Sequence, residues 1–228
     1  MRIAEIYRSV QGEGSLTGTP STFVRTSGCN LRCWFCDTPH ASWKPEGEDR
    51  SVEEVFDAVD RLDAHHVVLT GGEPMLFSEL RPLCTLLRQA KFHITIETSG
   101  TLYLPLECDL ISISPKLSNS TPSSLQSPRW HDRHEKARYT PEIVAQLILE
   151  YDYQLKFVVD KEEDLDEIRS YLAELDDVEP SKVYLMPQGI EIDELIRTGT
   201  WLENYCQQHG FQFCPRKQIE WFGTLRGT

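Results

Sequence analysis

Apolar residues along the chain fall into short continuous runs separated by stretches of helical periodicity. The runs predict eight strands, at residues 3–10, 22–26, 66–70, 93–97, 109–114, 153–159, 182–186 and 211–214. Between them, apolar positions spaced three and four apart predict helices over 51–62, 80–90, 161–175 and 192–208, and another that starts at Thr140. This alternation predicts an α/β fold with a parallel sheet and right-handed crossovers, in which the first strand lies at an edge.

Local signals mark where several helices begin. Ser51, with Glu54 three residues later, is a capping box. Thr140 and Pro141 are typical of an N-cap and a first helical position. Pro74 likewise fits the start of the helix that follows the strand at 66–70.

Four of the predicted strands are followed by similar types of residue. Glycine, hydroxyl and proline residues follow four strands, as Gly71-Gly72-Glu73-Pro74, Thr98-Ser99-Gly100-Thr101, Ser114-Pro115-Lys116 and Pro187-Gln188-Gly189. The carboxyl ends of parallel strands lie on one rim, where ligands bind in open sheets and barrels. The paired glycines also suit an ordinary turn, so from the pattern alone both interpretations stand.

Residues 117–139 differ in composition from the rest and are rich in serine, histidine and arginine. The segment predicts a polar, mobile loop that could act as a lid. His131 and His134 lie in it without a carboxylate or thiol framework, so a solvated loop is favoured over a metal site.

Charge and cysteine usage narrow the class of protein. The net charge is −13 and the pI about 5.0, which argues against a nucleic-acid-binding or anionic-membrane surface. No run approaches the ~20 apolar residues that span a bilayer, and residues 1–14 hold no signal-peptide core. Seven cysteines, three of them clustered, favour metal binding in a reducing cytoplasm over disulfides. The other four, Cys84, Cys108, Cys206 and Cys214, are expected in the core.

The cluster of cysteines has the spacing C-x3-C-x2-C, at Cys29, Cys33 and Cys36. Soft thiolates bind zinc, copper(I) or iron–sulfur clusters. A 4Fe-4S cube normally takes four cysteines, so three would leave one iron open to a small molecule. Two aromatic residues between Cys33 and Cys36 could shield such a cluster from water. A Cys3His zinc site completed by His40 is the alternative.

Together, this spacing and the Gly71-Gly72-Glu73-Pro74 segment resemble the radical S-adenosylmethionine (SAM) superfamily. The resemblance implies a partial (β/α)6 barrel in which three cysteines hold a 4Fe-4S cluster. It also implies that the open iron chelates the amino and carboxylate groups of SAM.

A narrower resemblance covers nearly the whole chain. The segments at 9–14, 23–25, 36–38, 97–101, 112–116, 155–159, 221–223 and 226–227 are similar to those of 7-carboxy-7-deazaguanine synthases. This family implies radical ring contraction of 6-carboxy-5,6,7,8-tetrahydropterin with loss of ammonia, a lyase step toward queuosine and tRNA modification. It further implies one radical SAM domain over residues 1–228, whose tail at 215–228 closes the site.

Site roles follow from this resemblance, motif by motif, with no catalytic residue beyond the cofactor. Cys29, Cys33 and Cys36 would hold the cluster and Thr38 a Mg2+ ion. The expected SAM contacts are Phe35, Asp37, Gly72, Glu73, Ser99, Ser114, Pro115, Lys116 and Gln188. The expected pterin contacts are Gln11, Gly12, Glu13, Arg25, Thr70 and the terminal carboxylate of Thr228. Gln218 departs from the pattern, because many relatives have histidine there.

The resemblance also implies partners: the pterin, an external one-electron donor such as flavodoxin or ferredoxin, and a second copy in a homodimer, but neither nucleic acid nor membrane. Two alternatives remain, a glycyl-radical activase acting on a protein partner and a zinc-binding interaction module. Residues 11–14, Arg25 and Thr38 favour a small anionic substrate over the activase.

Overall fold

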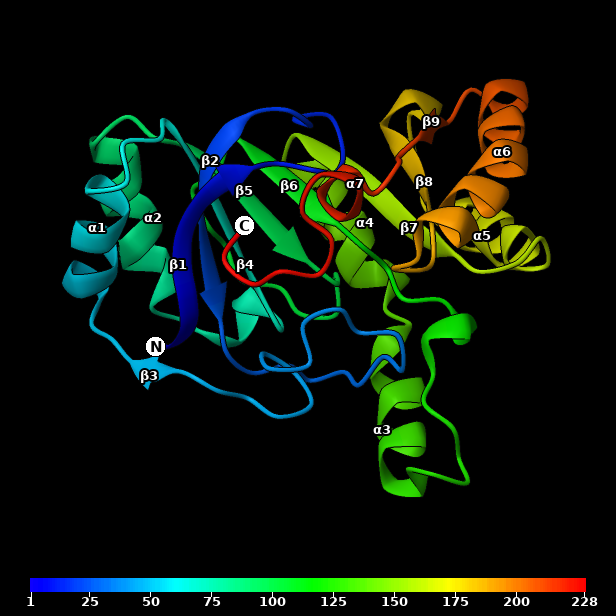
Figure 1. The fold of residues 1–228 in the computed structure, drawn as a ribbon, viewed down its shortest axis with the longest axis horizontal. Coiled ribbons are helices and arrows are strands. Elements are labelled where there is room, and N and C mark those ends of the chain that lie inside the picture. Colours follow the sequence, from blue (N-terminus) through cyan, green and yellow to red (C-terminus); the bar gives the residue numbers. More distant parts are fainter.

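One nine-stranded sheet runs through the computed structural model, which describes all residues from 1 to 228 (Figure 1). Its strands are β1 (Arg2–Val10), β2 (Pro20–Thr26), β3 (Glu48–Asp49), β4 (His66–Gly71), β5 (His93–Thr98), β6 (Leu110–Ile113), β7 (Tyr153–Val159), β8 (Val183–Pro187) and β9 (Gln212–Phe213). Their order across the sheet is β3-β1-β2-β4-β5-β6-β7-β8-β9.

From β2 to β9 every neighbouring pair is parallel, whereas β1 runs antiparallel to β2, and β3 to β1. The eight predicted strands are therefore confirmed, but the first of them is not itself the edge strand, because β3 pairs with the outer side of β1. β3 has two exposed residues and no apolar run, so the sequence pattern did not reveal it.

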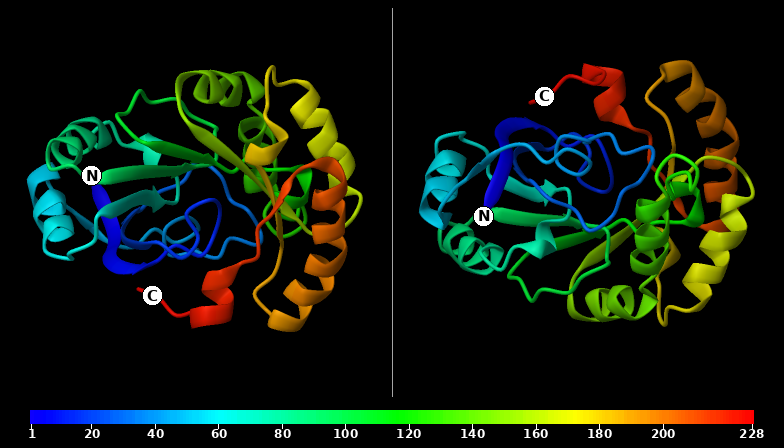
Figure 2. Two further views of the ribbon diagram at one scale, coloured as in Figure 1. Left: turned by 90° about the horizontal axis from the view of Figure 1, so that it is seen from above. Right: turned by 90° about the horizontal axis from the view of Figure 1, so that it is seen from below.

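Helices cover the outside of the curved sheet (Figure 2). The α-helices are α1 (Val52–Asp60), α2 (Leu80–Gln89), α3 (Pro128–Arg138), α4 (Pro141–Glu150), α5 (Asp164–Ala173), α6 (Ile192–His209) and α7 (Lys217–Phe222). Short 3-10 turns are η1 (Pro74–Leu76), η2 (Ser118–Ser120) and η3 (Pro180–Lys182). The open, mostly parallel sheet with outer helices confirms the predicted partial barrel. No helix has the length and apolar character needed to cross a membrane.

The apolar strand interiors form the core. Val67, Val68 and Leu69 of β4 are completely buried, as expected for a parallel strand covered on both faces. At the start of α1, Ser51 and Glu54 make the reciprocal hydrogen bonds of the predicted capping box.

One local prediction was wrong. Residues 128–138, expected to be part of a loop, form α3, and His134 within it is completely buried instead of solvated. Thr140 and Pro141 occupy the predicted N-cap and first helical positions of α4, although the hydroxyl of Thr140 donates to the carbonyl of Gly100 at 2.9 Å and makes no hydrogen bond to the helix. Pro74 opens the 3-10 turn η1, so the α-helix proper starts only at Leu80.

Candidate active site

The cysteine loop leaves the sheet at the carboxyl end of β2 and folds back on itself, so that its two ends meet there. Here the cysteine loop means residues 27–45. The amide of Gly28 donates to the carbonyl of Ala41 at 2.8 Å, which closes the neck of the loop. The loop that carries the three cysteines therefore lies beyond the carboxyl end of β2, at the rim where the parallel strands end (Figure 1).

Gly71 and Gly72 press directly against this neck. The amide of Gly72 donates to the carbonyl of Thr26 at 3.1 Å, and that of Glu73 to the carbonyl of Gly28 at 2.8 Å. A Cβ added at Gly72 would lie 2.1 Å from the carbonyl oxygen of Gly28. Glycine is required here because two backbones meet without room for a side chain.

Glu73 has no exposed surface, and its carboxylate accepts four hydrogen bonds. The donors are the amide of Met75 at 3.1 Å, the hydroxyl of Thr98 at 2.8 Å, and the amide and hydroxyl of Ser99. The carboxylate thus ties the end of β4 to the end of β5. A contact of Glu73 with a ligand would come from its backbone, since its side-chain oxygens are already occupied.

The thiols receive donors from their own loop. The amide of Leu31 points to Sγ of Cys29 at 3.4 Å, and the hydroxyl of Ser42 lies 3.1 Å from Sγ of Cys36. Burial raises the pKa of the Cys29 thiol to about 12 and that of Cys33 to about 11. These thiols would lose their protons on binding iron, because coordination to a metal deprotonates a thiol outright.

This donor set fits an iron–sulfur cube better than a single zinc ion. No three His, Cys, Asp or Glu side chains converge closely enough to hold one metal ion. In a cube each thiolate binds its own iron, so such convergence is not needed. His40, the candidate fourth zinc ligand, instead places Nε2 3.5 Å from a carboxylate oxygen of Glu5.

Segment 117–138 supports the cysteine loop from outside. The buried His134 ring accepts from the amide of Arg32 at 3.1 Å through Nδ1, and its Nε2 lies 2.9 Å from the hydroxyl of Ser120. Burial lowers the pKa of His134 to about 4, so the ring is neutral at pH 7. The guanidinium of Arg32 lies 4.0 Å from the ring centroid of Trp130. The sequence predicted a mobile loop here that could act as a lid, and did not reveal this supporting role.

The two aromatic residues of the loop shield it less than expected. Trp34 is 54% exposed and packs edge-on against the half-buried Phe35, with ring centroids 5.4 Å apart. Its backbone amide donates to Ser120 at 3.1 Å and its indole N–H to the carbonyl of Asn119 at 2.7 Å. Trp34 therefore attaches the loop to η2 more than it covers the cysteines.

The other residues expected to contact SAM lie on the same rim. Ser114 follows β6, and its amide donates to the carbonyl of Thr98 at 2.8 Å. The ammonium of Lys116 folds back to the hydroxyl of Ser114 at 2.8 Å. The half-buried Gln188 continues from β8, where its amide donates to Val159 at 2.8 Å. β4, β5, β6 and β8 thus bring these residues to one edge of the sheet.

Beside this rim lies a buried ionic network, of which sequence reasoning identified only Glu13 and Asp37. The ammonium of Lys156, in the middle of β7, lies 3.1 Å from Glu13 and 3.0 Å from Glu97. The guanidinium of Arg216 pairs with Asp37 and approaches Glu13 at 3.6 Å. A lysine within an otherwise apolar strand was the signal that could have revealed Lys156.

The charges in this network stabilise one another. Burial alone would raise the pKa of Glu13, but Lys156 and Arg216 bring it down to about 2. Burial alone would lower the pKa of Lys156, yet Glu97 and Glu13 raise it above its usual value. Gln218 also donates to Glu13 through its side-chain amide, while its own carbonyl oxygen is buried without a partner. Both ends of the chain are therefore joined at Glu13.

Arg25 projects from β2 next to the cysteine loop. Its guanidinium donates to Glu5 at 2.6 Å and to the hydroxyl of Tyr7 at 2.8 Å, both on β1. Thr70 lies opposite Arg25 in the β2–β4 register and is buried. Gln11, at the end of β1, donates to the hydroxyl of Ser21 at 2.9 Å.

Gly12 and the chain end lie on the same side of the molecule. The carbonyl of Gly12 accepts from the amide of Lys217 at 3.1 Å, and a Cβ at Gly12 would lie 2.5 Å from the backbone of Gln218. Thr228 makes only a local hydrogen bond, from its hydroxyl to the carbonyl of Leu225 at 3.0 Å. Thr38 lies behind Cys36, with its hydroxyl 3.7 Å from that sulfur.

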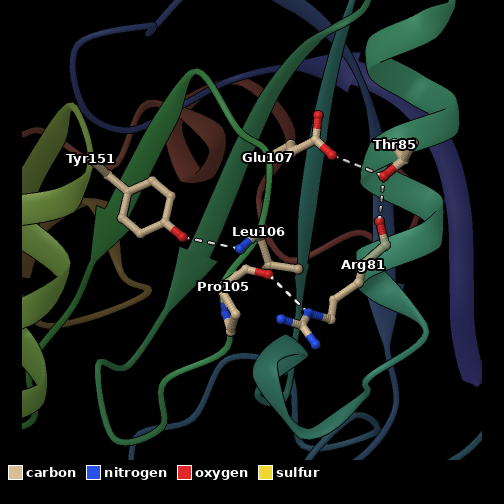
Figure 3. A pocket seen from close by; sticks show the side chains of 6 residues that line it. All are labelled: Arg81, Thr85, Pro105, Leu106, Glu107 and Tyr151. Atoms are coloured by element: carbon tan, nitrogen blue, oxygen red, sulfur yellow. Dashed lines mark hydrogen bonds between the residues drawn. The ribbon is translucent and has the colours of Figure 1, made fainter.

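A surface hollow elsewhere does not belong to this site (Figure 3). It is lined by residues of α2, the β5–β6 connection and the end of α4: Arg81, Thr85, Pro105, Leu106, Glu107 and Tyr151. Arg81 donates to the carbonyl of Pro105 at 3.2 Å, and the hydroxyl of Tyr151 accepts from the amide of Leu106 at 3.0 Å. These polar groups satisfy one another, and none comes from the rim that carries the cysteines.

Three cysteines on a rim loop, clamped by a Gly-Gly-Glu segment in an open barrel, define a radical SAM protein. A sequence profile of the radical SAM superfamily matches residues 23–151, more than half of the chain. A relative in Rhodopirellula baltica is 48% identical over 227 residues, covering 99% of this chain and 88% of the relative. Another in Halobacterium salinarum is 42% identical, covering 95% and 88%. Both relatives are named 7-carboxy-7-deazaguanine synthase.

The crystal structure of QueE from Escherichia coli superimposes with a TM-score of 0.69 at 26% identity, covering 94% of this chain and 92% of that one. Within the superfamily, the chain belongs to the 7-carboxy-7-deazaguanine synthases. The alternatives of a glycyl-radical activase and of a zinc module are not favoured, because the similarity to these synthases extends over nearly the full length of this chain.

Proposed function

We propose that the chain converts 6-carboxy-5,6,7,8-tetrahydropterin to 7-carboxy-7-deazaguanine with loss of ammonia. Identity of 48% to a synthase over 99% of the chain carries this proposal. The family places a 4Fe-4S cluster and SAM in the site, and the lyase class is consistent with the name of the relatives. Queuosine synthesis, and through it tRNA modification, belongs to the same proposal.

Cys29, Cys33 and Cys36 would hold the cluster, since they occupy a loop whose neck is fixed by Gly72 and Glu73. When bound, the cluster and SAM would supply a carbon radical able to abstract hydrogen from the substrate. The protein's part is to fix the reacting groups and exclude water. For SAM we assign the rim residues Phe35, Asp37, Gly72, Glu73, Ser99, Ser114, Pro115, Lys116 and Gln188.

For the pterin we assign the residues around the ionic network: Gln11, Gly12, Glu13, Arg25, Thr70 and Thr228. Glu13 stays ionised because Lys156 and Arg216 hold its pKa low, so it can accept hydrogen bonds from the N–H groups of the pterin. Arg25 is a fixed cation for the substrate carboxylate. Burial alone would lower its pKa, but Tyr7 and Glu5 raise it above the usual value, so it keeps its proton.

Mg2+ forms a finer part of the proposal, with Thr38 as its protein ligand. Magnesium takes oxygen ligands and keeps water or substrate in its sphere, so one hydroxyl plus substrate oxygens is sufficient. Thr38 lies beside Cys36, so an ion held by its hydroxyl would lie at the cysteine loop. The proposal also includes an external one-electron donor and a homodimer. A cytoplasmic location belongs to it as well, since free thiols need a reducing compartment.

Anaerobic turnover tests the proposal directly. The reconstituted protein is incubated with the carboxypterin, SAM, dithionite and Mg2+, and the products are separated by chromatography and identified by mass. We expect 7-carboxy-7-deazaguanine and ammonia in equal amounts. Recovery of unchanged pterin from protein with a full complement of iron would rule the function out.

The same assay also tests the assignment of Thr38 as a Mg2+ ligand. The wild type is expected to lose activity on removal of Mg2+, whereas Thr38→Ala should turn over slowly and respond weakly to the ion. An unchanged rate and unchanged metal dependence in Thr38→Ala would remove Thr38 from the proposal.

A further inference from the structure

Helix α3 gives an acidic protein one basic face. Its eleven residues include four cations and two carboxylates, whereas the whole chain has a net charge of −13. Arg129, Arg133 and Lys136 are exposed and make no ion pair, and the exposed Asp132 beside them is the one carboxylate of the helix that Arg138 does not pair. We call these three exposed cations the basic arm. Figure 1 shows α3 extending away from the sheet, below the rim.

The basic arm is attached to the cysteine loop itself. Trp130 stacks on Arg32, and His134 binds the backbone of Arg32, one residue before Cys33. On the other side of Cys33, the exposed Trp34 is hydrogen-bonded to the turn that leads to α3. Arg133 also lies over Trp130, 4.8 Å from its ring centroid, so the basic arm adjoins the part of the cysteine loop around Arg32.

A cluster in this loop has to receive an electron from outside, and electron transfer slows steeply with distance. A donor protein must therefore dock close to the cysteines. Most of the surface is acidic and repels an anionic partner, while the basic arm attracts it, so the charge distribution both draws and orients such a partner. Three free cations are few compared with the 6–10 phosphate contacts of a protein that binds nucleic acid through electrostatics.

We infer that the basic arm and Trp34 form the docking surface for an acidic one-electron carrier protein. The inference rests on the proposed function, because a cluster that is reduced from outside is what makes a donor necessary. It also gives the segment at 117–139 a role that the reaction itself leaves unassigned.

Charge reversal tests the inference. Arg129→Glu with Lys136→Glu changes two side chains that make no hydrogen bond or ion pair, and Arg61→Glu with Lys91→Glu makes the same charge change beside α1 and α2, with both residues exposed. An acidic flavodoxin, reduced beforehand, serves as the donor, and cluster reduction is followed by stopped-flow absorbance. We expect the arm variant to be reduced about tenfold more slowly at low salt, and the control pair to change far less.

Turnover driven by dithionite distinguishes a defect in donor docking from a defect in the reaction itself. Dithionite is a small reductant that needs no docking surface, so both variants should match the wild type in dithionite-driven turnover. Reduction of the wild type by flavodoxin should also slow as salt is raised, since screening weakens the attraction. If the substrate were not converted even with dithionite, the proposed function would fail, while the reduction rates would still report on docking.

Equal reduction rates for the arm variant and the control pair would overturn the inference. So would a tRNA-binding affinity that falls in the arm variant while flavodoxin reduction stays unchanged, because the arm would then serve nucleic acid.

Discussion

Lys156 illustrates how a single buried charge can organise a site. It lies in β7 between Glu13 and Glu97, and only about 5% of its side chain is exposed. A buried ion pair adds little net stability, but removal of one partner leaves an uncompensated charge that costs about 3–5 kcal/mol. The lysine is therefore more important for holding Glu13 ionised and oriented than for stabilising the fold.

Replacement of Lys156 by methionine should destabilise the protein by about 3 kcal/mol at pH 7 and alter its response to acid. The pKa of Glu13 is depressed in the folded state, so its contribution is present above pH 4.5 and is lost as the pH falls toward 2. In Lys156→Met this pKa rises toward its ordinary value, so the loss of stability between pH 4.5 and 2 should be smaller than in the wild type. Urea unfolding between pH 3 and 8 measures both effects, and a profile parallel to the wild type would contradict them.

At the scale of elements, the sequence revealed those that bury apolar residues in the sheet. The eight runs and the Ser51 capping box are visible because strand interiors and helix starts leave local patterns. α3 leaves none, since it has few apolar residues and packs on the cysteine loop through His134 and Trp130 instead of on the sheet. Such contacts depend on residues about a hundred positions away.

His134 is expected to control how firmly α3 holds the cysteine loop. Burial lowers its pKa to about 4, below the ordinary value of 6.5, so the unfolded chain binds the proton more readily. Stability should therefore be complete above pH 6.5 and decrease as the pH falls toward 4, by up to about 3 kcal/mol. In His134→Ala, urea unfolding should show about 2 kcal/mol less stability at pH 7 and a flatter profile in this window.

The exposed His65 provides the control for this experiment. His65→Ala should keep both the stability and the pH profile of the wild type. A wild-type profile that is already flat between pH 6.5 and 4 would contradict the role given to His134.

A further prediction concerns the close contact of Gly72, after β4, with the neck of the cysteine loop, here called the clamp. In Gly72→Ala the new methyl group would meet the carbonyls of Gly28 and Ala41, so the neck of the loop must move. We expect the variant to fold but to retain less than about half of the iron after reconstitution, as chemical iron analysis would show, because shifted thiolates hold a cluster poorly. Gly18→Ala is the control: it strains a positive φ in open space and should keep its iron. Full iron occupancy in Gly72→Ala would contradict the clamp.

At the scale of the whole molecule, the site depends on contacts that no local pattern contains. The rim was predictable, because parallel strands bring their ends together whatever connects them. The pairing of Asp37 with Arg216 and of Glu13 with Gln218 joins residues 179 and 205 positions apart. These contacts exist because the chain after β9 crosses from one edge of the open sheet to β1 at the other (Figure 2).

The last prediction concerns the end of this crossing segment. Arg226 pairs with Glu46 at 3.1 Å and approaches Glu5, the carboxylate that also binds Arg25, at 4.0 Å. Deletion of residues 225–228 removes mostly exposed side chains, so the free energy of unfolding should change by less than about 0.5 kcal/mol. Because the proposed pterin contacts include the chain end, we expect the deletion to raise KM for the carboxypterin about tenfold, the equivalent of one lost hydrogen bond. Iron content and dithionite-driven cluster reduction should stay at the wild-type level, which separates substrate closure from cofactor binding. An unchanged KM would show that the tail lies beside the site without closing it.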